Sequence, residues 1–165
     1  MEIIVDGYNV IAFDQGLEGN LERKRTWLVQ QLSHYKDRKG FVITVVFDAW
    51  NTRFIEEVTE TRNGVRVLYS RQGEKADEVI VRITRAKGSS CVVITSDREV
   101  RRAVEKFGAI VVDTTEFVDI LHKMETWDRV DMVDQSETVA TREGNPRRLS
   151  KTERKRRETI RKLWI

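Results

Sequence analysis

Cysteine, histidine and proline are scarce in this chain of 165 residues, which has one Cys, two His and one Pro. A lone Cys91 cannot form an intramolecular disulfide, and with only His34 and His122 beside it the chain lacks the ligands of a His/Cys zinc cluster. No apolar run approaches the roughly 18 residues that a membrane span needs, and the N-terminus has no basic segment followed by an apolar one that would mark a secretion signal. These absences predict a cytoplasmic protein of a reducing compartment with no membrane as a partner.

Motifs of several common enzyme classes are also missing. The chain has no Gly-x-x-x-x-Gly-Lys-Ser/Thr loop and no Gly-x-Gly-x-x-Gly after its first apolar run, so we expect no nucleotide cofactor. It has no Gly-x-Ser-x-Gly elbow, and its two distant histidines give little support to a nucleophilic triad. An aspartyl-phosphate phosphatase would need a second Asp two positions after Asp6, where the chain has Tyr8.

Charge is abundant, at 35% of residues, and it is unevenly distributed. The segment from Arg142 to Ile165 carries ten basic and three acidic residues, whereas the preceding residues have a net charge of −4. A basic segment of this kind is typical of a surface that meets the phosphates of a nucleic acid or a ribosome. The alternative is a solvated C-terminal tail.

Short β-branched runs separated by helical periodicity predict an α/β fold. Each run is apolar throughout, which is the pattern of strands covered on both faces in a parallel sheet. We therefore expect an open, mainly parallel five-stranded sheet with helices on both faces. The expected strands are residues 3–5, 41–47, 65–69, 91–95 and 109–112. The expected helices contain Leu21 to Tyr35, Phe54 to Val58, Ala76 to Ile83, Val100 to Phe107 and Phe117 to Met124, the fourth opened by a capping box of Ser96 and Glu99.

The chain becomes polar and aperiodic after the last of these helices. We expect one domain over residues 1–125, followed by a linker and a basic, partly helical C-terminal tail over residues 126–165. The only proline, Pro146, precedes a weakly amphipathic segment from Arg147 to Trp164.

Acidic residues follow the predicted strands. Asp6 follows the first strand, Asp48 the second and Asp97 the fourth, while Asp77 opens the helix after the third. Because the carboxyl ends of parallel strands share one edge of a sheet, we expect these carboxylates to converge there. Like charges so placed raise one another's pKa unless a cation compensates. Oxygen ligands without His or Cys suit Mg²⁺ or Mn²⁺.

Each acid also has a purely structural interpretation. Asp77 and Asp97 could serve the first turns of their helices, and Asp48 could belong to an ordinary loop. Asp6 is harder to explain in this way, because it follows an apolar strand directly and precedes a glycine.

Four segments in the same order resemble NYN domains, the branch of the PIN-like nuclease superfamily that includes the bacterial YacP-type proteins. The resemblance covers roughly Met1 to Met124. The segments are Val5-Asp6-Gly7-Tyr8-Asn9-Val10-Ile11, Val45-Val46-Phe47-Asp48-Ala49, Glu74-Lys75-Ala76-Asp77-Glu78 and Val93-Ile94-Thr95-Ser96-Asp97.

The resemblance implies a metal-dependent endoribonuclease that cleaves mRNA. Asp6, Asp77 and Asp97 would hold Mg²⁺ or Mn²⁺, and Asn9 and Asp48 would assist as further catalytic residues. YacP-type proteins are associated with endonucleolytic cleavage of mRNA, in at least one case on the translating ribosome, so RNA is the implied substrate and the ribosome an implied partner. The basic tail lies outside the matched motifs, and its role in docking to a ribosome rests on charge.

Residues near the same edge are candidates for holding RNA. They are Tyr8, Arg53, Arg71, Lys75, Ser96 and Arg98. For the basic residues the alternative is surface solvation, and for Tyr8 it is packing rather than stacking on a base. Two other functions stay open: a non-catalytic RNA- or ribosome-binding module, and a metal-dependent phosphatase or nucleotidase of small phosphates.

Overall fold

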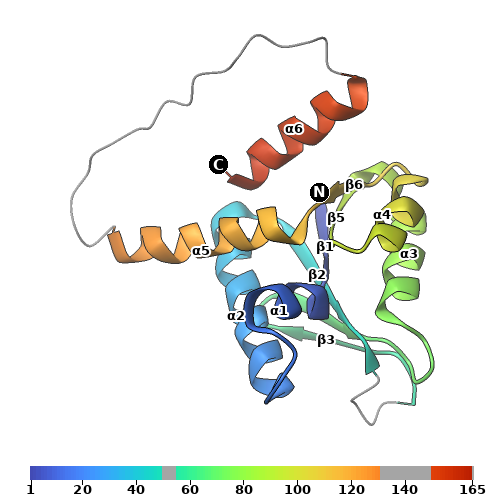
Figure 1. Ribbon diagram of the computed structural model, residues 1–165, viewed down its shortest axis with the longest axis vertical. Helices are drawn as coiled ribbons and strands as arrows, with labels where there is room; N and C mark the ends of the chain where they lie inside the picture. The colour runs from blue at the N-terminus through green and yellow to red at the C-terminus, as the bar shows by residue number, and fades with distance from the viewer. Residues whose placement is uncertain (50–54, 131–149, 165) are drawn as a thin grey trace.

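A six-stranded sheet forms the centre of the molecule (Figure 1). The computed structural model describes residues 1–49, 55–130 and 150–164. The strands run in the order β3-β4-β2-β1-β5-β6, and every neighbouring pair is parallel except β3 and β4. The strands are β1 (Glu2–Asp6), β2 (Val42–Phe47), β3 (Val58–Arg62), β4 (Val65–Tyr69), β5 (Cys91–Ile94) and β6 (Ile110–Val112).

Helices cover both faces of this sheet, as the sequence predicts. Figure 1 shows α3 and α4 on one face and α1, α2 and α5 on the other. The helices are α1 (Gly7–Gln15), α2 (Leu21–Lys39), α3 (Ala76–Lys87), the short 3₁₀ helix η2 (Gly88–Ser90), α4 (Arg98–Glu105), α5 (Thr114–Val130) and α6 (Lys151–Trp164). Within the described ranges no helix combines the length and apolarity that crossing a membrane requires.

The period-2 alternation of a strand divides the core into two clusters. On β1, Ile3 and Val5 face the cluster under α1, α2 and α5, whereas Ile4 faces the cluster under α3 and α4. All three side chains are fully buried. This double coverage explains why β1 is apolar throughout rather than alternating.

Strand order reverses at β1, which pairs with β2 on one side and β5 on the other. From β1 the chain forms β2 beside it, then the edge strand β3, then β4 between β3 and β2, and finally adds β5 and β6 on the opposite side of β1. Such a switch point leaves a crevice outside the carboxyl ends of the strands. Asp6, the last residue of β1, stands at this point.

Three predictions about local structure are wrong. The short helix expected at 54–58 is absent over its described part: Ile55 is exposed and Val58 begins β3, which raises the strand count from five to six. The burial of β3 alternates along its five residues, as in an antiparallel edge strand with one covered face.

Helix α1, which begins at Gly7, was not predicted. Helix α4 is capped by Asp97, whose side chain accepts backbone hydrogen bonds, and not by Ser96.

The basic tail ends in a helix that packs on the domain. In α6, Leu163 is fully buried, and its carbonyl accepts a hydrogen bond of 3.1 Å from the Tyr35 hydroxyl. Lys123 Nζ lies 4.3 Å from the centre of the Trp164 ring. The predicted tail helix is therefore confirmed over 151–164, while Pro146 and Leu149 lie outside the described residues. The domain boundary at residue 125 stays a prediction, and α5 continues past it to Val130.

The close approach of α1 to β2 depends on a glycine. A Cβ added to Gly7 would lie 2.3 Å from Cε1 of Phe47, a ring that is fully buried. We predict that Gly7→Ala lowers the free energy of unfolding by about 1–3 kcal/mol through overpacking. Urea unfolding in a double-mutant cycle with Phe47→Leu measures this. The alanine should cost less beside Leu than beside Phe, and an equal cost in both backgrounds would contradict the steric explanation.

Candidate active site

All five residues predicted to be catalytic line one cavity of about 300 Å³ at the carboxyl edge of the sheet. Asp6 comes from the end of β1, Asn9 from α1, Asp48 from the segment after β2, Asp77 from α3 and Asp97 from the start of α4. The convergence expected from strand order is therefore present in the structure. Among the described residues no Lys or Arg lines this cavity.

Asp6 is the most buried of these carboxylates, with 6% of its surface exposed. It caps α1 by accepting a hydrogen bond of 3.3 Å from the Asn9 backbone N–H, and the Thr95 hydroxyl donates to its other oxygen at 3.3 Å. Burial raises the pKa of Asp6 to about 7; the Asn9 N–H opposes this shift, and the negative charges of Asp77 and Asp97 add to it. A buried carboxylate without a basic partner is the feature that a bound cation would stabilise.

Asp77 lies in the first turn of α3 and is half-buried. Burial and the nearby charge of Asp97 raise its pKa, Lys75 opposes them, and Asp48 and Glu99 contribute in the raising direction. Burial, together with the acids around it, therefore favours the protonated form of Asp77.

Thr95 ties two of the acids together. Its buried hydroxyl donates to Asp6 and accepts a hydrogen bond of 3.1 Å from the Asp97 backbone N–H. Asp97 in turn caps α4 through one oxygen, Oδ1, which accepts from the N–H groups of Glu99 and Val100. The other oxygen, Oδ2, has no hydrogen-bond donor in the described part of the chain. Asp97 is thus a helix cap that retains an oxygen for a ligand.

Ser70 positions the loops that carry Asp48 and Asp77. Its fully buried hydroxyl accepts a hydrogen bond of 3.0 Å from the N–H of Ala49 and donates one of 2.7 Å to the carbonyl of Glu74. Ala49 follows Asp48 directly, and Glu74 leads into the N-terminus of α3. Sequence reasoning missed Ser70 because a buried hydroxyl is indistinguishable there from a solvated one.

Asn9 is held by residues that follow β5 and β6 in the chain. Its Oδ1 accepts hydrogen bonds from the Ser96 N–H, at 3.0 Å, and from the Thr114 hydroxyl. With Oδ1 occupied, the amide nitrogen Nδ2 remains as a donor at the cavity. Asn9 can therefore contact an anionic oxygen of a ligand.

Asp113 is a further acid at this edge that sequence reasoning missed. Asp113 directly follows β6, much as Asp6 ends β1. An acid next to the end of an apolar strand is the sequence signal that could have identified it. Its oxygens accept hydrogen bonds from the Ser96 hydroxyl at 3.0 Å and from Arg101 at 3.2 Å. Despite partial burial, hydrogen bonds from Thr115 and Ser96 and the charge of Arg101 lower its pKa. Asp113 is therefore a paired, structural acid that positions Ser96.

The residues predicted to hold RNA have different environments. Lys75 caps α3 beside Asp77 and is exposed, and Arg98 is exposed at the start of α4. Arg71 pairs with Glu74 at 3.5 Å and does not line the cavity. Tyr8 lines the cavity, but its ring packs edge-on against Phe47 and its hydroxyl accepts from Arg25 at 2.6 Å, so it has a packing role as well. Arg53 lies outside the described residues.

Apolar side chains also line the cavity, among them Ala12, Leu17 and Leu21. Lys24 fixes the loop that carries Leu17. Its ammonium group donates three hydrogen bonds of 2.7–3.0 Å to the carbonyls of Gln15, Gly16 and Glu18. The lining of the cavity thus combines acidic and apolar side chains.

The acidic donor set of the cavity suits Mg²⁺ or Mn²⁺. In the described ranges, no group of three Asp, Glu, His or Cys side chains lies close enough together to bind one metal ion directly. Mg²⁺ usually retains several waters and is bound through one or two carboxylates. Asp6 and Asp97, joined through Thr95, supply such a pair, and the uncompensated buried charge of Asp6 fits a cation.

Comparisons with known proteins identify the family of this chain. The family model for the YacP-like NYN domain matches residues 3–162. The chain is 32% identical to protein YacP of Bacillus subtilis over 134 residues, which are 77% of this chain and 76% of that one. The crystal structure of Rae1 (YacP) from Bacillus subtilis superposes with a TM-score of 0.67 at 28% identity, covering 80% of this chain and 79% of that chain. Its W164L mutant gives 0.65 at 25% identity, covering 99% and 92%.

The raised pKa of Asp6 predicts how stability depends on pH in the presence of a chelator. Between the ordinary carboxyl pKa and about 7 the folded protein retains a proton that the unfolded chain has lost, so stability falls as pH rises through this window. Asp6→Asn removes the ionisable group and therefore this dependence of stability on pH. We predict that from pH 5 to pH 8 the free energy of unfolding of Asp6→Asn increases by about 2–3 kcal/mol relative to that of the wild type, because one pKa unit corresponds to about 1.4 kcal/mol.

Urea unfolding at the two pH values measures this difference. Asp119→Asn, on the exposed face of α5, is the matched control and should track the wild type at both. A gap between wild type and Asp6→Asn that stays constant with pH would contradict the prediction.

Proposed function

Because this chain belongs to the family of YacP-like NYN domains, which is of the PIN-like nuclease type, we propose that it is a metal-dependent endoribonuclease that hydrolyses phosphodiester bonds of mRNA. The observation that carries the proposal is the convergence of Asp6, Asp48, Asp77 and Asp97 on one cavity that no described basic side chain lines. Such a cluster is costly for stability and is expected where it serves a cation.

Asp6, Asp77 and Asp97 are the residues that would hold Mg²⁺ or Mn²⁺, with Asp48 close by. A divalent ion at such a site lowers the pKa of bound water and neutralises phosphate charge. Hydrolysis adds one water across a P–O bond: the water oxygen joins phosphorus, and a proton goes to the departing ribose oxygen.

The chain's own residues then orient the substrate. Asn9 offers its Nδ2 to a phosphate oxygen, because its Oδ1 is already held by Ser96 and Thr114. Lys75 and Arg98, exposed at the N-termini of α3 and α4, are suited to neighbouring phosphates. The apolar side chains of Ala12, Leu17 and Leu21 can receive a base.

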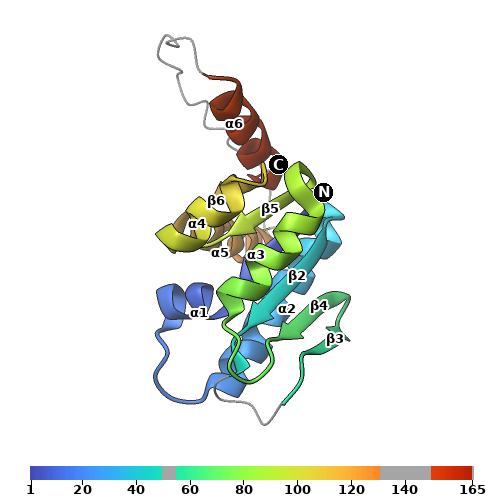
Figure 2. The ribbon, with the colours of Figure 1, turned by 90° about the vertical axis from the view of Figure 1, so that its right-hand side faces the viewer.

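The ribosome is the proposed partner, and α6 is its proposed contact. This helix presents seven basic residues and two acidic ones over Lys151–Trp164. It lies near the N-terminus of the chain and beside β5 and β6 (Figure 2), where its residues Lys155 and Thr159 line a cavity with Met1 and Cys91. The basic helix is thus at the amino ends of the strands, opposite the acidic cavity. It would bind structured RNA while the cavity receives the mRNA. Cys91 is a free, buried thiol. This fits the reducing cytoplasm, where ribosomes and mRNA occur.

Cleavage of end-labelled single-stranded RNA in Mn²⁺ or Mg²⁺, with and without translating ribosomes, tests the proposal. We predict internal cuts that a chelator abolishes and that Asp6→Asn slows more than about 100-fold, since even residues behind a metal ligand are worth 10–100-fold. Asp119→Asn should cut at the wild-type rate.

The remaining outcomes separate the alternatives. Cuts that appear only with ribosomes, and that weaken when Arg154 and Arg157 on the exposed side of α6 are changed to Glu, would support the partner. No metal-dependent cleavage by folded protein under either condition would favour a non-catalytic RNA- or ribosome-binding module. Hydrolysis of a mononucleotide without cleavage of RNA would favour a phosphatase.

A further inference from the structure

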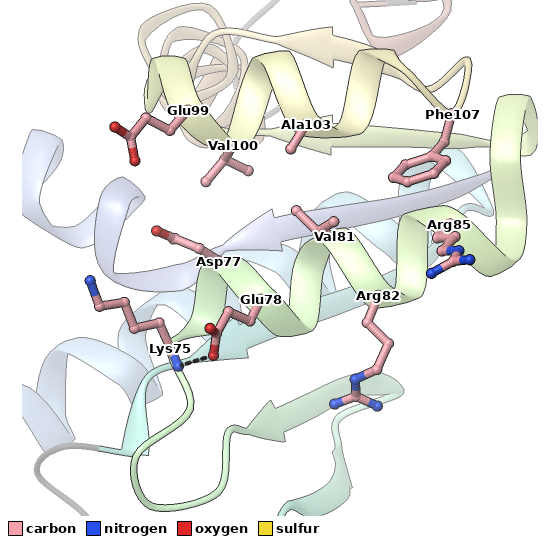
Figure 3. Close-up of a pocket in the computed structure, with 10 residues that line it drawn as sticks. All are labelled: Lys75, Asp77, Glu78, Val81, Arg82, Arg85, Glu99, Val100, Ala103 and Phe107. Carbon is pink, nitrogen blue, oxygen red and sulfur yellow. Dashed lines mark hydrogen bonds between the residues drawn. The ribbon is translucent and has the colours of Figure 1, made fainter.

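A second cavity, of about 590 Å³, lies between α3 and α4 and begins at the acidic cluster (Figure 3). Asp77 lines both cavities, so the groove leads directly away from the candidate active site. We call it the α3–α4 groove. The residues that line it along its length include Asp77, Val81, Arg85, Ala103 and Phe107.

Helical spacing arranges this lining in order. Asp77, Val81 and Arg85 follow one another at i, i+4 and i+8 on α3, which extends the groove about 12 Å along the helix axis. On the opposite wall, Ala103 lies on α4 and Phe107 lies in the turn that follows this helix, farther from the acidic end. An apolar floor therefore leads from the carboxylates to an aromatic ring.

The two ends of the groove differ in charge. Asp77, Glu78 and Glu99 stand at the end near the active site, whereas the far end holds Arg85 and Phe107 (Figure 3). Arg85 is exposed and has no ion-pair partner in the part of the chain that the structure describes.

The neighbouring arginine, Arg82, differs from Arg85 because it has ion-pair partners. Arg82 also lines the groove, but its guanidinium group forms ion pairs with Glu57 and with Glu74. Arg85 is thus the cation that remains available to a ligand at the far end.

We propose that the α3–α4 groove binds the single-stranded RNA that flanks the scissile phosphate, with a base against Phe107 and a phosphate at Arg85. This inference rests on the proposed ribonuclease function. Aromatic side chains together with cationic ones bind single strands without reading their sequence, and the far end of the groove holds one of each. Continuity through Asp77 places the bound flank next to the cavity, and the volume is that of a small-molecule site. Two or so nucleotides fit such a space better than a partner helix does.

Kinetics on RNA with long flanks test the groove in the intact protein. We predict that Arg85→Glu and Phe107→Leu each raise KM roughly 5- to 100-fold, the range expected for one lost stacking or phosphate contact, with little change in kcat. Phe107→Leu keeps an apolar side chain in the groove, so its effect reports on the ring. Arg102→Glu is the matched charge reversal, on an exposed part of α4 outside the groove, and should leave KM near the wild-type value.

Shortening the RNA identifies the flank. Trimming one side of the cleavage site should raise the wild-type KM and abolish the difference between wild type and Arg85→Glu, while trimming the other side preserves it. If Arg85→Glu matches Arg102→Glu on every substrate while the wild type cuts RNA, the groove proposal fails and the proposed function stands.

Crosslinking gives an independent readout that does not need cleavage. In the Asp6→Asn protein, RNA containing 4-thiouridine should crosslink to peptides that contain Phe107, and Phe107→Leu should reduce this product. Should the wild type cut no RNA, the proposed function fails and crosslinking alone decides about the groove. Crosslinks confined to other surfaces would overturn the inference, as would Arg85→Glu weakening ribosome association while KM for free RNA is unchanged.

Discussion

The burial of the Asp6 carboxylate at the end of the central strand is the constraint on which the site depends. Strand β1 is covered on both faces and paired on both edges, so its last residue is largely removed from water. The fold supplies this carboxylate with hydrogen bonds from Asn9 and Thr95 and places Asp77 and Asp97 nearby. Burial is the main cause of the raised pKa of Asp6, and the charges of Asp77 and Asp97 add to it; a divalent cation would stabilise the ionised carboxylate.

Buried hydroxyl groups hold the remaining parts in place. Ser70 joins the segment after β2 to the approach of α3, Thr95 joins Asp6 to Asp97, and Thr114 holds Asn9. All three hydroxyl-bearing residues are fully buried. Because each lies within or directly beyond the carboxyl end of a strand, the sheet itself fixes the spacing of the acids. This arrangement fixes the positions of the acids, and it leaves Asp97 Oδ2 without a hydrogen-bond donor among the described residues.

Much of this could be predicted from the sequence, because the signals were local. Continuous apolar runs indicated the parallel strands, and acids directly after those runs located the cavity. The edge strand β3 was missed because only one of its faces is covered, and the spacing of Ile55 and Val58 also fits a helix. Ser70 and Thr114 act through contacts distant in sequence, which no local pattern encodes. The position of α6 opposite the acids likewise follows from packing of Leu163 and not from its charge.

The central claim is that the acidic cavity is a cation site on which Asp6 acts directly. Anomalous diffraction from crystals soaked in Mn²⁺ tests this most directly, in wild type and in Asp6→Asn. The account predicts a manganese peak in the cavity between β1 and the N-termini of α3 and α4, and the loss or strong weakening of that peak in Asp6→Asn. A cavity without manganese in the wild-type protein, or equal occupancy in the two proteins, would contradict it.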